Sequence, residues 1–353
     1  MVAIGAQDAF ITGKPEVSFF QSTYKRHTNF AQVVDRQIIQ GTPTPGGMST
    51  IRFERRGDLL GFVYLVANDG TKTLAPEDWT QMISSAELYI GGQLIDAQDS
   101  NFTERIAPLV FSQNISKSTI GGGHNGPGVT SSFYPFRFWF CENMQSALPL
   151  VGLQYQDIEI RIYWGSTFTF TPSGSGATPQ TVLGWDLYSQ YVFLDETERE
   201  HVMNKTQTML ITQVQKMPPS GLKTQEIVFN HPIKYLVSAP VDPTVPSALT
   251  SESNKIVVQI NGTDIGDYKY AAPNYTDVMM YYFSPFTQTD NNVFLFPFCL
   301  DVAKLQPTGS LNFSRLDSVR IVSQTLPFAD VIYGVNYNIL RIEKGQAGLM
   351  YTN

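Results

Sequence analysis

The stretch from Phe133 to Trp164 constrains the fold most, because apolar side chains recur in it with a period of two. The alternating residues are Phe136, Phe138 and Phe140 in its first part and Ile158, Ile160, Ile162 and Trp164 in its last part. Such alternation of aromatic and β-branched residues is typical of strands with one buried face. Between the two parts, Pro149 lacks a backbone donor and ends any helix. We therefore predict a strand, a long connection and a second strand.

The same pattern returns later in the chain. Phe-Trp-Phe-Cys at 138–141 returns as Phe-Pro-Phe-Cys at 296–299, and Ile-Arg-Ile at 160–162 returns as Val-Arg-Ile at 319–321. Three further pairs keep the same order along the chain: Ile51–Phe53 with Ile227–Phe229, Ile90–Gly92 with Ile260–Gly262, and Tyr191–Leu194 with Tyr337–Leu340. The spacing between partners falls towards the C-terminus. This predicts an internal duplication whose second half has shorter loops.

The chain of 353 residues suits two domains, each able to bury its own core. Residues 195–204 (DETEREHVMN) are the densest charge cluster, and Asp195 is placed as the N-cap of a short helix. We therefore predict an N-terminal arm at 1–30, a first domain at 31–194, a linker helix at 195–204 and a second domain at 205–353.

Strands at regular spacing, without alternation of helix and strand, indicate antiparallel β-sandwiches. The helical exception in the first half is Asn101–Ser112, while 116–132 and 166–181 are rich in small and turn-forming residues and are expected at the loop-bearing end. The pattern alone leaves jelly-roll and immunoglobulin-like topologies both open.

Composition excludes several classes of function. Charged residues make up 16% of the chain, below the roughly 25% typical of soluble domains, which suits a surface that is covered by partners. The net charge of −7 argues against nucleic-acid binding, which needs a basic face. Two cysteines, each in a predicted apolar strand, do not make a disulfide framework. Met1–Ala9 lacks the features of a signal peptide, and the apolar run Leu59–Ala67 is too short to span a membrane.

No motif for catalysis or ligand binding is convincing. Gly121–Gly126 fits G-x-G-x-x-G, but Pro-Gly and a strand follow it where the dinucleotide fingerprint needs a helix. The four histidines are scattered, without the spacing of a metal site. We expect no catalytic site, cofactor or metal.

Residues 1–30 combine apolar and basic side chains without regular periodicity. Phe19, Phe20 and Tyr24 stand next to Lys25, Arg26 and His27. We predict an extended arm or short helix that docks on a partner through these residues. The alternative is a terminal segment packed on its own domain.

Several stretches resemble the major capsid protein of nucleocytoplasmic large DNA viruses, the family of phycodnaviruses, iridoviruses and mimivirus relatives. They run from one end of the chain to the other: Gly5–Asp8, Tyr24–Phe30, Ile90–Gly92, Phe138–Cys141, Ala147–Leu150, Leu194–Arg199, Gln306–Arg315 and Val335–Arg341. The departure is length, because relatives carry longer loops. This chain is therefore expected to have a lower outer surface.

The resemblance implies an all-β protein of two tandem eight-stranded antiparallel jelly-roll sandwiches, with short helices in loops and linker. It implies a structural subunit, not an enzyme, that forms homotrimeric pseudo-hexagonal capsomers of an icosahedral shell and is assembled in the host cytoplasm. The implied partners are neighbouring capsomers and minor capsid and penton proteins. The shell lies over an internal membrane that the chain does not span. The alternatives are a capsid paralogue and a carbohydrate-binding viral jelly roll, an attachment lectin whose exposed Tyr and Trp stack on sugars.

Overall fold

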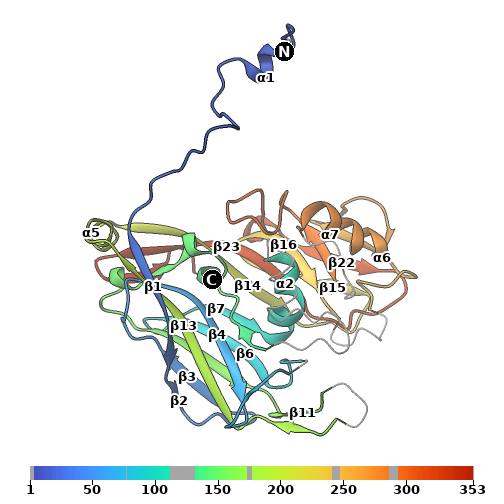
Figure 1. The fold of residues 1–353 in the computed structure, drawn as a ribbon. Coiled ribbons are helices and arrows are strands. Elements are labelled where there is room, and N and C mark those ends of the chain that lie inside the picture. Colours follow the sequence, from blue (N-terminus) through green and yellow to red (C-terminus); the bar gives the residue numbers. More distant parts are fainter. Residues whose placement is uncertain are drawn as a thin grey trace.

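The computed structural model describes residues 4–76, 78–111, 132–172, 177–240, 247–285 and 293–352. Its strands gather in two antiparallel β-sandwiches that lie side by side, and the N-terminal arm projects away from them (Figure 1).

The first sandwich consists of two sheets. Its strands are β1 (Phe30–Gln37), β2 (Ile39–Gln40), β3 (Met48–Arg52), β4 (Leu59–Asn68), β5 (Thr73–Leu74), β6 (Ile83–Ile90), β7 (Gln93–Asp99), β8 (Tyr134–Pro135), β9 (Leu148–Pro149), β10 (Ile158–Trp164) and β13 (Gly184–Leu194). One sheet has the order β1-β13-β4-β5, with β8 and β9 also paired to β4, and the other has the order β2-β3-β10-β6-β7. The short strands β11 (Thr169–Phe170) and β12 (Gln180–Thr181) pair with each other.

The second sandwich repeats this plan. Its strands are β14 (Gln207–Met217), β15 (Thr224–Glu226), β16 (Pro232–Ser238), β17 (Lys255–Ile260), β18 (Thr263–Asp264), β19 (Lys269–Tyr270), β20 (Phe294–Pro297), β21 (Leu311–Asn312), β22 (Val319–Ser323), β23 (Ile332–Glu343) and β24 (Gln346–Leu349). One sheet has the order β14-β23-β16-β20, with β21 and β24 at its sides, and the other has the order β15-β22-β17-β18, with β19 paired to β17.

The helices are short and, apart from α1, lie between strands. They are α1 (Ala9–Thr12), the π-helix η1 (Phe102–Ile106), α2 (Ala107–Val110), α4 (Trp139–Glu142), the 3₁₀ helices η2 (Met144–Ser146), η3 (Leu150–Gly152) and η4 (Phe313–Arg315), α5 (Glu196–Asn204), α6 (Ala271–Asn274) and α7 (Asp277–Phe283). The helical prediction for residues 101–112 is confirmed over 102–110 by η1 and α2, and Ser112 lies outside the described residues.

The two halves match strand by strand, which confirms the duplication. The strands β1, β3, β4, β6, β7, β8, β10 and β13 correspond in sheet position to β14, β15, β16, β17, β18, β20, β22 and β23. Eight strands in two sheets, ordered β1-β13-β4-β8 with β3-β10-β6-β7, form a jelly roll. The second half repeats this order, so the immunoglobulin-like alternative is wrong.

The two matching hairpins repeat down to single hydrogen bonds. Gly91–Gly92 joins β6 to β7 with φ angles of 58° and 82°, and Asn261–Gly262 joins β17 to β18 with 50° and 78°. Two consecutive positive φ angles are the requirement of a type I′ turn, which Gly and Asn meet at least cost. Gly91 donates its backbone N–H to Asp157 O, and Asn261 donates to Ser318 O, both at 2.8 Å.

The predicted strand at 136–140 is partly wrong. Only Tyr134–Pro135 pairs as a strand there, and Trp139–Glu142 is helical. Phe136, Phe138 and Phe140 are nonetheless buried, and their rings stack in sequence with centroids 6.2 and 6.1 Å apart. Because the segment is buried on several sides, its apolar spacing did not have to follow one sheet face. Both cysteines are free and lie outside strands.

The loop prediction can be followed only in part. Residues 116–131 and 173–176, which make up most of one predicted loop and the centre of the other, lie outside the described residues.

Each half buries a core of its own, as expected, and the two halves also share a third apolar cluster. One apolar cluster belongs mainly to the first sandwich and a second belongs to the other sandwich. A third cluster joins the halves, because Phe102, Ile106 and Val110 pack with Tyr235 and Val335. Residues 102–110, which follow β7, therefore belong to a core that both halves share.

A substitution at Ile160 tests which face of its strand is buried. The structure bears out the predicted facing, because Ile160 and Ile162 are fully buried in the first core. Ile160→Asp places a carboxylate there at a cost of several kcal/mol, against a typical total stability of about 5–15 kcal/mol. We expect insoluble protein. Ile160→Val, which costs about 0.5–1.5 kcal/mol, serves as the control in urea unfolding. Soluble Ile160→Asp protein with an unchanged unfolding midpoint would contradict the assignment.

Candidate assembly surfaces

The six arm residues singled out by the sequence lie on one exposed segment. Phe19, Phe20 and Tyr24 are 95%, 100% and 84% exposed, and Lys25, Arg26 and His27 are also exposed. Figure 1 shows the arm leaving the body at β1. The packed alternative is therefore not what this structure shows. Large aromatic side chains held in water are typical of a segment that binds elsewhere.

A polar contact lines the junction between the two jelly rolls. Asp96 of β7 is buried, and its carboxylate accepts hydrogen bonds from Val214 N of β14 at 2.9 Å and from Gln98 Nε2 at 2.8 Å. Gln213 of β14 donates to Ile95 O. Burial raises the pKa of the Asp96 carboxyl to about 7, against the opposing effect of these hydrogen bonds.

The segment that follows β7 continues this junction. Tyr333 of β23 donates its hydroxyl to the Asp99 carboxylate at 2.9 Å. Arg105 of η1 donates to Pro240 O at 2.7 Å, and Ser284 donates to Leu109 O at 2.7 Å. These bonds and the shared apolar cluster fix one jelly roll on the other.

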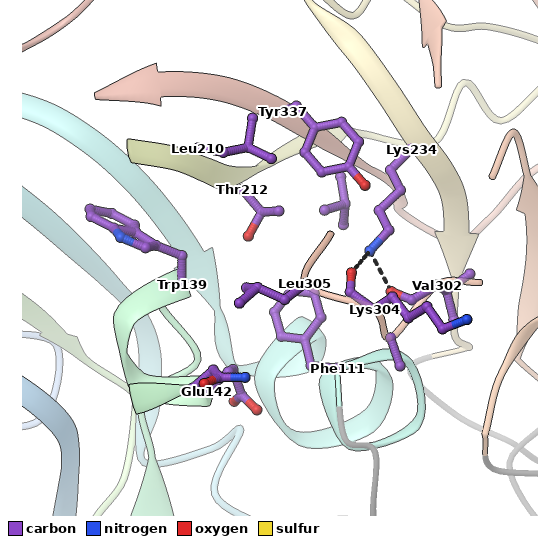
Figure 2. A pocket seen from close by; sticks show the side chains of 13 residues that line it. Phe111, Trp139, Glu142, Leu210, Thr212, Lys234, Val302, Lys304, Leu305 and Tyr337 are labelled. Atoms are coloured by element: carbon purple, nitrogen blue, oxygen red, sulfur yellow. Dashed lines mark hydrogen bonds between the residues drawn. The ribbon is translucent and has the colours of Figure 1, made fainter. Parts of the chain in front are cut away.

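A cavity of about 120 Å³ lies at the same junction (Figure 2). Its lining includes Phe111 and Trp139 from the first half and Lys234 and Tyr337 from the second. The Lys234 ammonium donates to Val302 O at 2.7 Å and to Lys304 O at 3.0 Å, and burial lowers its pKa. These two hydrogen bonds connect Lys234 of β16 to the backbone around Val302. Sequence reasoning did not single it out, since only the fold brings those carbonyl groups to it.

The charged helix α5 is anchored by one buried carboxylate. Asp195 accepts from Glu196 N at 2.8 Å at the start of the helix. Arg199 binds Asp58 in a bidentate pair, with Nε and Nη2 at 2.9 and 3.0 Å from the two carboxylate oxygens. Leu194 N donates to the same carboxylate at 2.8 Å. The Asp58–Arg199 pair fixes the connection between the sandwiches. The sequence did not indicate Asp58, because it lies far from Arg199 in the chain.

All four tryptophans are at least 92% buried, so none offers the stacking surface of a sugar site. Within the described ranges, His, Cys, Asp and Glu side chains form no group of three suited to a metal ion. Among the same residues, no helix has the length and apolar character needed to cross a membrane.

Two family models match the chain. The model described as "Major capsid protein N-terminus" matches residues 18–195, and "Large eukaryotic DNA virus major capsid protein" matches residues 198–348.

Curated relatives align over the whole chain. The major capsid protein of Pyramimonas orientalis virus is 30% identical, and that of Paramecium bursaria Chlorella virus 1 is 27% identical; each alignment covers 100% of this chain and 98% of the relative. The alignments extend over 397 and 439 positions, more than the 353 residues of this chain. Both relatives therefore carry insertions relative to it, as expected.

Solved structures share the fold. The quasi-atomic model of the PBCV-1 virus capsid superposes with a TM-score of 0.77 at 23% identity, covering 95% of this chain and 100% of that one. The Faustovirus major capsid protein superposes with a TM-score of 0.65 at 11% identity, covering 96% and 94%.

Asp96 gives the junction a defined pH dependence. Its pKa is about 7 in the folded protein against 3.8 ordinarily, so the folded state favours the protonated form. The stabilising contribution is complete below about pH 4 and is lost as pH rises through 7, with a slope of up to about 1.4 kcal/mol per pH unit. Asp96→Asn should remove this slope. The unfolding free energy of the variant, measured relative to that of the parent, should therefore increase between pH 4 and 8. A constant difference over this range would contradict the prediction.

Proposed function

We propose that this chain, which belongs to the large eukaryotic DNA virus major capsid protein family and is a structural subunit of the virion shell, acts there as a homotrimer. Three copies with two jelly rolls each would place six similar bodies around one axis. The resulting capsomer has a pseudo-hexagonal outline and tiles an icosahedral shell.

The observation that carries this proposal is the repeated jelly roll. The two halves have the same strand order and are fixed on each other by a shared apolar cluster. Cyclic assembly closes every interface between copies, which leaves a compact body with similar sides. A permanent trimer contact is expected to bury roughly 2,000 Å² or more and to be rich in aromatic residues.

The proposed organisation is an arm at 1–30, jelly rolls at 31–194 and 205–353, and a linker helix at 195–204. The last strand of the first sandwich ends at Leu194, and the first strand of the second begins at Gln207. The helix between them is held by the Asp58–Arg199 pair.

The arm is proposed to make the contacts on the inner side of the shell. Phe19, Phe20 and Tyr24 would anchor it in neighbouring capsomers or in minor capsid and penton proteins, and Lys25, Arg26 and His27 would add charge complementarity. Their exposure in the single copy supports this role. The shell would lie over an internal membrane without spanning it and without direct contact with nucleic acid, and it would be assembled in the host cytoplasm. No step of this role requires catalysis.

A main shell protein is favoured over a paralogue. Three relatives named major capsid protein align with 100% of this chain and others so named with 65–76% of it, whereas mimivirus capsid protein 1 and probable capsid protein 4 align with 66% and 47%.

The trimer is tested directly by mass. The purified chain of 39.4 kDa should elute as a species of about 118 kDa, three times that mass, in size-exclusion chromatography with multi-angle light scattering. Negative-stain images of this species should have a hexagonal outline. A monomer at every concentration up to tens of micromolar would refute the proposal.

Removal of residues 1–28 tests the arm. Because β1 begins at Phe30, the truncation leaves the sandwich intact, so the trimer should persist while assembly into larger shells is impaired. Light scattering follows both. Full-length protein with Phe19→Ser and Phe20→Ser should show the same defect. A monomeric truncated protein would place the arm in the trimer contact instead.

A further inference from the structure

Two helical segments occupy the same place in the duplicated topology. In the first jelly roll, η1 and α2 lie between β7 and β8; in the second, α6 and α7 lie between β18 and β20. The flanking strands correspond to each other in the two sheets. The two segments are therefore counterparts.

Their surroundings differ. From Phe102 to Val110 every residue except Arg105 is buried, because the second sandwich covers this segment. In α7, Met280 is fully buried, but Val278, Tyr281 and Tyr282 are 39%, 65% and 73% exposed. Residues three and four apart share one side of a helix. The tyrosine face of α7, defined as Val278, Tyr281 and Tyr282, thus lacks within one copy the cover that its counterpart has.

The cover of η1 and α2 is the outer face of the sheet β14-β23-β16-β20. Val214, Val335, Tyr235 and Pro297 form a row across this sheet. Tyr235 and Val335 are fully buried in the cluster with Phe102 and Ile106. Leu236, next to Tyr235, faces the opposite side and the sandwich's own core. This sheet therefore has apolar cover on both faces.

The corresponding sheet of the first jelly roll has an aromatic outer face. The matching row is Arg36, Tyr188, Tyr64 and Pro135, so Tyr64 and Tyr188 stand where Tyr235 and Val335 stand in the second half. The rings of Tyr64 and Tyr188 stack with centroids 5.4 Å apart, and Phe62 lies 6.1 Å from Tyr64. Phe62 is 37% exposed and both tyrosines are half-buried. These three residues define the aromatic sheet face.

We propose that the tyrosine face of α7 packs on the aromatic sheet face of a second copy of this chain. The contact between copies would then repeat the contact that joins the two jelly rolls within one copy. This inference rests on the proposed trimer and names the surfaces that form it.

The composition of the two faces fits this occupant. The contact within the chain is made by Phe102, Ile106 and Val335, which never meet water in the folded protein. The faces offered to another copy are rich in tyrosine, whose hydroxyl stays hydrated in the free copy while the ring supplies apolar area on binding. Aromatic residues are enriched in protein interfaces for this reason.

The positions of the two faces fit a closed ring. Figure 1 shows α7 over the second sandwich, apart from β4 and β13 in the first, so the two faces of one copy do not meet each other. A head-to-tail contact between different surfaces closes into a ring when the rotation allows it. In a ring of three copies with two jelly rolls each, every tyrosine face and every aromatic sheet face would then be covered by a neighbouring copy.

Single substitutions test each face. Tyr282→Glu and Phe62→Glu should each weaken association roughly a hundredfold or more, since each places a carboxylate in an aromatic contact. Both should then run as monomers at micromolar concentration. Leu222→Glu is the matched control, because Leu222 is 67% exposed in the loop between β14 and β15, and it should remain a trimer. Unchanged circular dichroism and melting temperature establish that each variant is folded.

The decisive experiment mixes the two variants. The Phe62→Glu copy keeps its α7 face, and the Tyr282→Glu copy keeps its sheet face, so one native contact forms. The mixture should give dimers of twice 39.4 kDa and no trimers. If the parent is a trimer and the single variants remain trimers, or if the mixture stays monomeric, the two faces do not bind each other. A monomeric parent would refute the proposed trimer itself.

Discussion

The burial of residues 102–110 between the two sandwiches is the contact on which the rest of the structure depends. Phe102 and Ile106 are fully buried there, and burial of such a side chain contributes about 1.5–3 kcal/mol. The segment belongs to the first jelly roll by sequence, yet it covers the outer face of a sheet in the second. This contact, together with the polar bonds between β7 and β14, holds the two jelly rolls as a single body, as a subunit of a shell requires.

Hydrogen bonds between polar groups at this junction fix how the two jelly rolls are positioned along the apolar contact. Asp96 accepts from Val214 N, and Asp99 accepts from the Tyr333 hydroxyl. Such bonds do little for net stability when charge is buried, and the raised pKa of Asp96, about 7, records that cost. Their geometry is nevertheless demanding, because an unmade bond would leave a buried group unpaired. The two jelly rolls are thus fixed in one relative orientation.

Much of the fold could be predicted because its signals are local. The alternation in Ile158–Trp164 and the turns at Gly91–Gly92 and Asn261–Gly262 depend on neighbouring residues only. What failed depended on distant surfaces: residues 139–142 are helical within a buried segment, and the role of 102–110 requires knowing which sheet lies opposite. Of the candidate site, the exposure of the arm could be predicted, whereas its partners stay a prediction. The tyrosine face of α7 and the aromatic sheet face depend on the correspondence of strands between the two halves.

On this proposal, one contact is used twice, within a copy and between copies. An electron cryomicroscopy map of the purified capsomer, resolved well enough to place side chains, tests it most directly. We expect α7 of each copy to lie on β4 and β13 of its neighbour, with Tyr281 and Tyr282 against Phe62 and Tyr64. A map in which α7 faces solvent at the perimeter, while other surfaces join the copies, would contradict it.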